Sequence, residues 1–190
     1  LYKEIKENKQ EYLLCDIEIP LAEVLASMEH VGIAIDAPGI EKFGDKLDKT
    51  ISETEKRIFE HAGKEFNVNS PQQLSEILFE DLKLPPGKKT KTGYSTNIDV
   101  LEGLKGKHPI IEDILEYRQN AKLKSTYVDG LLAVVGEDGR IHSTFQQTLT
   151  RTGRISSTEP NLQNIPIRTE LGSEMRRFFV AGEGYKFLDA

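Results

Sequence analysis

The segment Thr152 to Arg168 reads TGRISSTEPNLQNIPIR and is the most informative stretch of this 190-residue chain. It is polar and irregular, and together with Arg151 it carries three arginines and three amides. The guanidinium and amide groups of these side chains each carry several N–H donors. Such forked donors suit the minor groove of a duplex, where the base acceptors lie at nearly the same place whatever the base pair. The alternative is a surface loop held by hydrogen bonds from its own side chains to its backbone.

Two long amphipathic helices are predicted before this loop, over residues 36–62 and 109–135. Asp36 is a suitable N-cap for the first helix, and Gly63 is suited to end it. Their apolar residues recur every three or four positions in stripes that need a packing partner. The stripes consist of Ile40, Phe43, Leu47, Ile51 and Ile58, with Thr54 between, and of Ile110, Ile111, Ile114, Leu115, Ala121, Val128 and Leu131. We expect the helices to pack as a long antiparallel hairpin.

Shorter elements are expected around the hairpin. They are a helix over 21–31 that ends at Gly32, strands over 33–35 and 140–149, a helix over 171–179, and the start of a strand over 185–188. The predicted fold class is therefore α+β and mostly helical, with a partial antiparallel sheet beside the hairpin.

The charge is distributed unevenly along the chain. Residues 1–81 hold 9 Lys and Arg against 18 Asp and Glu, whereas residues 82–190 hold 16 against 13, so the two parts carry −9 and +3. Any polyanion is therefore expected on the second part. The chain has no apolar run near the roughly 20 residues of a membrane helix. Its single cysteine, Cys15, cannot form an internal disulfide, which favours a reducing, cytoplasmic setting.

Two further groups of basic residues are candidates for nucleic-acid contacts. The segment Lys88 to Thr96 reads KKTKTGYST, and its ammonium and hydroxyl groups suit a phosphate backbone. It is expected at the far tip of the hairpin, and the alternative is a solvated loop. Arg118, Lys122 and Lys124, with Ser125 and Tyr127, lie on the second long helix, where a solvated helix surface is the alternative. The four histidines show no metal-ligand spacing.

Lys88 to Thr96, the run KLKSTY over 122–127 and above all Thr152 to Arg168 resemble the family A, bacterial polymerase I-type DNA polymerases. The stretches 21–29 and 32–36 resemble the same family at the start of its polymerase region, so the similarity covers nearly the whole chain. Two departures are small: Ile155 stands where the family usually has Leu, and Ser173 where it often has a basic residue.

The resemblance implies three parts: residues 1–35 as the start of the polymerase region at the palm base, residues 36–135 as the thumb, and residues 136–190 as the N-terminal part of the palm. The family's first catalytic aspartate lies in an Asp-Tyr-Ser motif that is expected just after Ala190. Asp189 lies two positions before that ligand, so the role is not assigned to it.

The resemblance also implies roles for individual residues. Lys88, Lys89, Lys91, Thr92 and Ser95, with Lys124, would lie along the duplex backbone. Arg154 would align the primer terminus, and Arg168 would lie near the incoming nucleotide. Asn161, Gln163 and Asn164 would lie near the template and the nascent base pairs.

The implied function is DNA-directed DNA polymerase activity in replication and repair, with primer-template DNA and deoxynucleoside triphosphates as partners. Catalysis in the complete polymerase would use two Mg²⁺ ions, and no metal is expected in residues 1–190. We expect a cytoplasmic monomer without membrane contact that binds DNA and is inactive alone. A self-standing duplex-binding module and a helical interaction scaffold are the alternatives. Neither explains both the forked-donor loop and the strands beside it.

Overall fold

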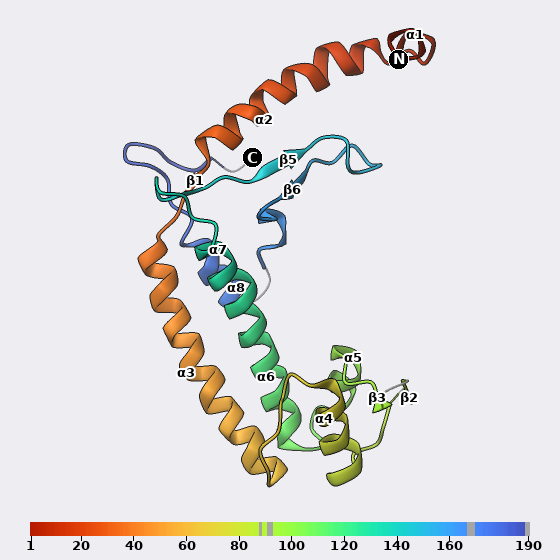
Figure 1. The fold of residues 1–190 in the computed structure, drawn as a ribbon, viewed down its shortest axis with the longest axis vertical. Helices are drawn as coiled ribbons and strands as arrows, with labels where there is room; N and C mark the ends of the chain where they lie inside the picture. Colours follow the sequence, from red (N-terminus) through yellow and green to blue (C-terminus); the bar gives the residue numbers. More distant parts are fainter. Residues whose placement is uncertain (88, 91–92, 167–169, 189–190) are drawn as a thin grey trace. The chain divides into compact units, whose positions relative to one another are not determined.

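The structure is a computed structural model that describes residues 1–87, 89–90, 93–166 and 170–188, with the backbone alone at 89, 90, 170 and 171 (Figure 1). The chain divides into two compact units, residues 1–41 with 127–190, and residues 42–126. The helical segments are α1 (Tyr2–Glu7), η1 (Leu13–Glu18), α2 (Ile19–Val31), α3 (Ala37–Ala62), α4 (Pro71–Ser75), η2 (Glu76–Asp81), α5 (Ile98–Gly103), α6 (Pro109–Leu123), η3 (Lys124–Asp129), α7 (Gly130–Leu132), η4 (Leu162–Asn164) and α8 (Glu170–Arg176). The strands are β1 (Ile33–Ala34), β2 (Lys89–Thr90), β3 (Gly93–Tyr94), β4 (Arg140–Ile141), β5 (Thr144–Gln146) and β6 (Ser156–Thr158).

Helix α3 forms where the sequence predicts it. The side chain of Asp36 accepts a hydrogen bond of 3.0 Å from the backbone N–H of Gly39, as an N-cap does. The predicted stripe is buried at Ile40, Phe43, Leu47, Thr54 and Ile58. The hydroxyl of Thr54 is satisfied inside the helix, because it donates to the main-chain oxygen of Thr50 at 2.7 Å.

The second long helix consists of α6, η3 and α7, which follow one another without a break from Pro109 to Leu132. It pairs with α3 in the antiparallel sense: Arg57 contacts Asp113 at 2.8 Å, while the earlier Asp48 contacts the later Lys124 at 3.5 Å. The antiparallel pairing confirms the predicted hairpin. The helix stops before the predicted Val135, because Val135 forms a bridge with Ile141.

The unit of residues 42–126 has its own apolar core. Its fully buried members come from α3, α4, η2, α5 and α6, and include Ile58, Leu74, Ile77, Leu78, Leu101, Ile110 and Ile114. Two of the short helices have side-chain N-caps, since Ser70 accepts from Gln73 and Asn97 accepts from Val100. The strands β2 and β3 form a hairpin beside α4 and α5, at the end where α3 finishes and α6 begins (Figure 1).

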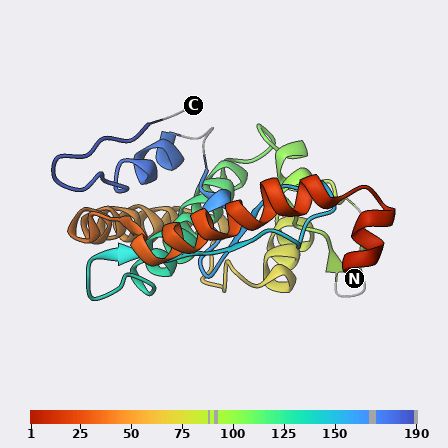
Figure 2. The same cartoon turned by 90° about the horizontal axis from the view of Figure 1, so that it is seen from above.

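The other unit holds two small antiparallel sheets, β1 with β4 and β5 with β6. Helix α2 runs beside β5 in both views (Figures 1 and 2), and a side-chain oxygen of Glu29 accepts a hydrogen bond of 2.6 Å from the backbone N–H of Phe145. The prediction of mixed helices and small antiparallel sheets is thus confirmed.

Two strand predictions are wrong in detail. The single strand expected over 140–149 is divided at His142 and Ser143, because the chain changes its pairing partner there, from β1 to β6. Within the described part of the chain, the segment 185–188 pairs with no strand, and the side chains of Tyr185, Phe187 and Leu188 are exposed. A strand needs a neighbour for its backbone hydrogen bonds, which an apolar pattern alone does not supply.

Candidate nucleic-acid interface

Arg154 lies at the end of a tight turn that follows β5. The hydroxyl of Thr150 donates a hydrogen bond of 2.6 Å to the main-chain oxygen of Arg154, and Gly153 between them has φ +75°, which favours glycine. The side chain of Arg154 is exposed, and among the described residues it has no hydrogen-bond or ion-pair partner. Its guanidinium donors are therefore available to a ligand.

The amides Asn161 and Gln163 begin the short helix η4. The side-chain oxygen of Asn161 accepts from the backbone N–H of Gln163 at 3.0 Å, which leaves the amide N–H₂ of Asn161 unused by this bond. The side chain of Gln163 braces the loop: its oxygen accepts from Ser157 N–H at 3.3 Å, and its nitrogen donates to Ile155 O at 2.7 Å. One amide hydrogen of Gln163 remains for another acceptor.

Asn164 is held by its backbone. The hydroxyl of Tyr127, in η3, donates a hydrogen bond of 2.5 Å to the main-chain oxygen of Asn164. The Asn164 residue itself is exposed. All four residues belong to the segment 150–164, called the loop below, but strand β6 separates Arg154 from Asn161, Gln163 and Asn164 at η4. The prediction that this stretch is irregular is therefore wrong at β6 and η4.

A pair of buried serines, Ser143 and Ser157, is hydrogen-bonded to the backbone of this loop. The hydroxyls of Ser143 and Ser157 lie 2.6 Å apart, and both contact the main-chain oxygen of Pro160, at 2.9 and 3.1 Å. Ser143 also donates to Thr158 O at 3.1 Å, and Leu162 N–H donates to the hydroxyl of Ser157 at 3.1 Å. Ser143 has no role predicted from the sequence, because an isolated serine pair leaves no periodic signal.

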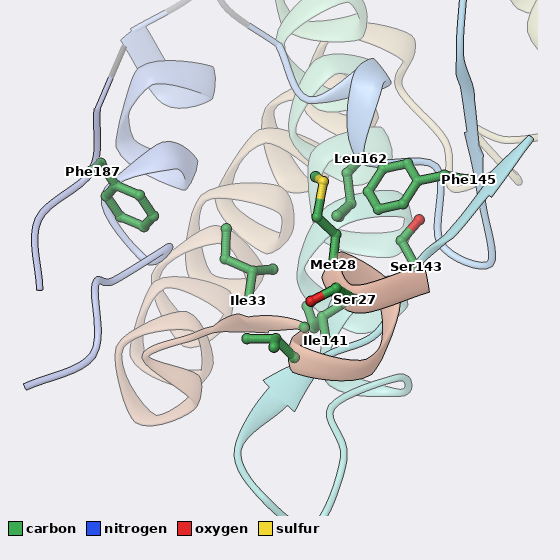
Figure 3. A pocket seen from close by; sticks show the side chains of 10 residues that line it. Ser27, Met28, Ile33, Ile141, Ser143, Phe145, Leu162 and Phe187 are labelled. Atoms are coloured by element: carbon green, nitrogen blue, oxygen red, sulfur yellow. The ribbon is translucent and has the colours of Figure 1, made fainter. Parts of the chain in front are cut away.

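An apolar cavity of about 430 Å³ lies beside the serine pair, since Ser143 is one of the residues that line it (Figure 3). Leu162, Phe145 and Ser143 line it together with Met28 and Ile33. Leu162 thus lines the cavity while its backbone N–H is bound to Ser157, so apolar and polar contacts both fix the loop.

The second predicted group belongs to the unit of residues 42–126. Lys88, Lys91 and Thr92 lie outside the described residues, and Lys89 is described as backbone in β2, opposite Tyr94 in β3. Tyr94 is anchored because its backbone N–H donates to the hydroxyl of Ser75 at 3.0 Å and its ring meets that of Phe79 edge to face. The segment that carries the lysines is therefore fastened where it returns to the core.

Arg118 and Lys124 have partners within the same unit. Arg118 donates to the main-chain oxygen of Thr96 and, at 3.3 Å, to its hydroxyl. Burial lowers the pKa of Arg118 below its usual value. The ammonium of Lys124 lies 3.5 Å from Asp48. The hydroxyl of Ser95 accepts from Asn97 N–H at 3.3 Å.

Arg168 lies outside the described residues. Within the described ranges, no group of three His, Cys, Asp or Glu side chains is arranged to hold a metal ion. Also within those ranges, no helix has the length and apolarity needed to cross a membrane.

A family model described as DNA polymerase family A matches residues 38–190. The chain is 54% identical over 177 residues to DNA polymerase I of Lactococcus lactis subsp. lactis strain IL1403, a match that covers 93% of this chain and 20% of the relative. It is 53% identical over 184 residues to DNA polymerase I of Geobacillus stearothermophilus, covering 96% of this chain and 21% of the relative. The chain therefore spans about a fifth of the length of these relatives.

A solved structure is similar over almost the whole chain. It is the POL domain of Pol1 from M. smegmatis, in complex with DNA primer-template and dNTP. The TM-score is 0.87 at 47% sequence identity, and the match covers 97% of this chain and 33% of the solved chain.

Proposed function

The chain belongs to DNA polymerase family A, and we propose that residues 1–190 grip primer-template duplex DNA during template-directed deoxynucleotide addition in replication and repair. The observation that carries the proposal is the loop 150–164, which is held by buried hydrogen bonds while Arg154 stays exposed. The complex of the similar M. smegmatis domain with primer-template DNA and dNTP supports the same ligands here.

The proposed roles are divided among three segments of the chain. Residues 36–135 form the thumb, residues 1–35 the palm base, and residues 136–190 the N-terminal part of the palm. Lys88, Lys89, Lys91, Thr92, Ser95 and Lys124 supply contacts to the duplex phosphates, which carry no sequence information. This role requires Lys124 to exchange its contact with Asp48 for one with DNA.

The loop residues are proposed to contact bases near the primer end. Arg154 aligns the primer terminus, and Asn161, Gln163 and Asn164 meet minor-groove acceptors of the nascent pairs. Because those acceptors are alike in all four base pairs, such contacts test pairing geometry without reading sequence. Arg168 is proposed to lie near the incoming nucleotide.

The described residues do not fit a two-magnesium centre, because no three of their acidic or histidine side chains converge. We propose that Mg²⁺ acts in the complete polymerase on ligands outside residues 1–190, and that residues 1–190 alone bind DNA without catalysis. A monomer in the cytoplasm is the proposed physiological form.

Fluorescence anisotropy of labelled primer-template DNA tests the proposal directly. Residues 1–190 should bind weakly, with an affinity that falls steeply as salt rises and changes little with sequence, because the contacts are to phosphates and degenerate acceptors. Duplexes of equal length and different sequence are the control. An affinity independent of salt, or a strong preference for one sequence, would contradict the proposal.

A further inference from the structure

We propose that Ser143 and Ser157 are positioning residues for catalysis, which set the place of the loop that carries Arg154 and Asn161. The inference rests on the proposed function. Its physical basis is the serine pair, which lies under that loop and fastens it to the sheet of β5 and β6.

The two hydroxyls form a closed set of hydrogen bonds. If Ser143 donates to Ser157, then Ser157 donates to Pro160 O and accepts from Leu162 N–H. If Ser157 donates to Ser143 instead, Ser143 donates to Pro160 O or Thr158 O. In both arrangements the two hydroxyls are bonded to each other and hold different parts of the backbone. Removal of the Ser157 hydroxyl leaves Leu162 N–H without this acceptor, and removal of the Ser143 hydroxyl leaves Ser157 as the only hydroxyl of the pair at Pro160 O and takes away the contact to Thr158 O.

Burial makes the link hard to replace. Ser143 is 5% exposed and Ser157 is 1% exposed, so bulk water has little access to the oxygens that a missing hydroxyl would leave. A buried polar group that loses its partner shifts the local structure or remains unsatisfied. The backbone from Thr158 to Leu162 is therefore expected to move when one hydroxyl is lost.

The same anchor reaches the turn that holds Arg154. Ser157 N–H donates to the side chain of Gln163, and the other end of that side chain donates to Ile155 O, next to Arg154. A displacement of Ser157 is thus transmitted to both sides of the loop. Neither serine needs to touch DNA for its loss to misplace Arg154 and Asn161.

The test uses a polymerase-length chain that contains these residues and measures single-turnover incorporation of a correct nucleotide into primer-template DNA. Ser143→Ala should lower the rate about tenfold, because small misplacements of positioning groups have large effects on rate. The dissociation constant for DNA should change less than about twofold, since the phosphate contacts dominate affinity. Ser156→Ala, a partly exposed serine in β6, is the matched control and should keep the wild-type rate.

Two further variants separate positioning from general destabilisation. Ser143→Thr should restore the rate, because it keeps the hydroxyl and its added methyl can enter the apolar cavity that Ser143 lines. In an Arg154→Ala background, Ser143→Ala should lower the rate less than about threefold, since residues that act through one another are not additive.

Equal rate losses from Ser143→Ala with and without Arg154 would overturn this inference and leave the proposed function standing. A Ser143→Thr variant as slow as Ser143→Ala would have the same meaning. A wild-type rate for Arg154→Ala would overturn the proposed role of the loop and this inference with it. If Ser143→Ala does not fold, Ser157→Ala is measured instead, with and without Arg154→Ala. Equal rate losses in the two backgrounds would again overturn the inference.

Discussion

Arg118 holds Thr96 at two points, because its guanidinium group donates to both the main-chain oxygen and the hydroxyl of that residue. Thr96 is 5% exposed and ends the lysine-rich segment. Arg118, a candidate for nucleic-acid contacts in the sequence, is thus already hydrogen-bonded within the protein. Its position on α6 fixes where the lysine-rich segment leaves the core.

Arg118→Ala should reduce the free energy of unfolding by about 1–3 kcal/mol, because buried polar atoms of Thr96 lose their partners. Urea unfolding followed by circular dichroism measures the change. Lys122→Ala, an exposed cation one turn further along the helix, should stay within about 0.5 kcal/mol of wild type. Equal effects of the two substitutions would show that the contact between Arg118 and Thr96 adds nothing.

Replacement of Lys88, Lys89 and Lys91 together by Ala should reduce the slope of log affinity against log salt by about 2 to 3, if each lysine neutralises one phosphate. Anisotropy titrations at several salt concentrations give the slope. The charge-matched control replaces Lys3, Lys6 and Lys9, which lie near the start of the sequence, and should leave the slope unchanged. An unchanged slope in the variant without Lys88, Lys89 and Lys91 would show that the segment is a solvated loop rather than a DNA contact.

Arg154→Ala in a polymerase-length chain should remove about 2–4 kcal/mol of transition-state stabilisation, which is roughly a 30-fold to 1000-fold loss of single-turnover rate. Lys89→Ala should weaken DNA binding and leave the rate from the bound complex nearly unchanged. Arg151→Ala, at a second exposed arginine of the same turn, shows whether the loss of rate is specific to Arg154. Rapid-quench primer extension distinguishes the three variants.

The stability of the chain should fall as the pH rises above about 6.5, because of His142. The hydrogen bond to Glu29 O, at 2.8 Å, and that to Asp138, at 3.2 Å, raise the pKa of His142 above 6.5, although desolvation and the charge of Arg140 oppose them. Both ring nitrogens donate only in the charged form. The folded state therefore binds the proton more tightly, and its contribution is complete below the unfolded pKa and lost as the pH passes the folded pKa.

Thermal unfolding of wild type and His142→Gln between pH 5 and 9 checks this prediction. The substitution should remove the part of the decline that His142 causes, whereas His30→Gln, at an exposed histidine of α2, should keep it. Parallel pH profiles for wild type and His142→Gln would contradict the assignment.

The periodic parts of the fold could be predicted from the sequence. The stripe from Ile40 to Ile58 gives α3 its buried face, and Asp36 gives its start, because helix spacing and capping depend on nearby residues. The same reasoning identified the segment 152–168 as polar but not the strand β6 and the helix η4 within it.

Contacts between distant residues could not be predicted in the same way. The division of the predicted strand at His142 depends on the pairing of β4 with β1, which lies more than a hundred positions earlier. The partnership of Ser143 with Ser157 depends on the pairing of β5 with β6. Neither leaves a local pattern, because each arises only when the chain has brought the two segments together.

The segment η3 is a π-helix, from which one residue can be removed without disturbing the helix that follows. Its hydrogen bonds span one residue more than those of an α-helix, so deletion of the exposed Ser125 would leave an ordinary helix with Val128 and Leu131 still on the buried side. Deletion of the exposed Glu53 from α3 would instead turn every later side chain by about 100° and take Ile58 out of the core. Cooperative unfolding should survive the first deletion and not the second. A one-residue deletion should accordingly be tolerated within η3 of the second long helix and rejected in the middle of α3.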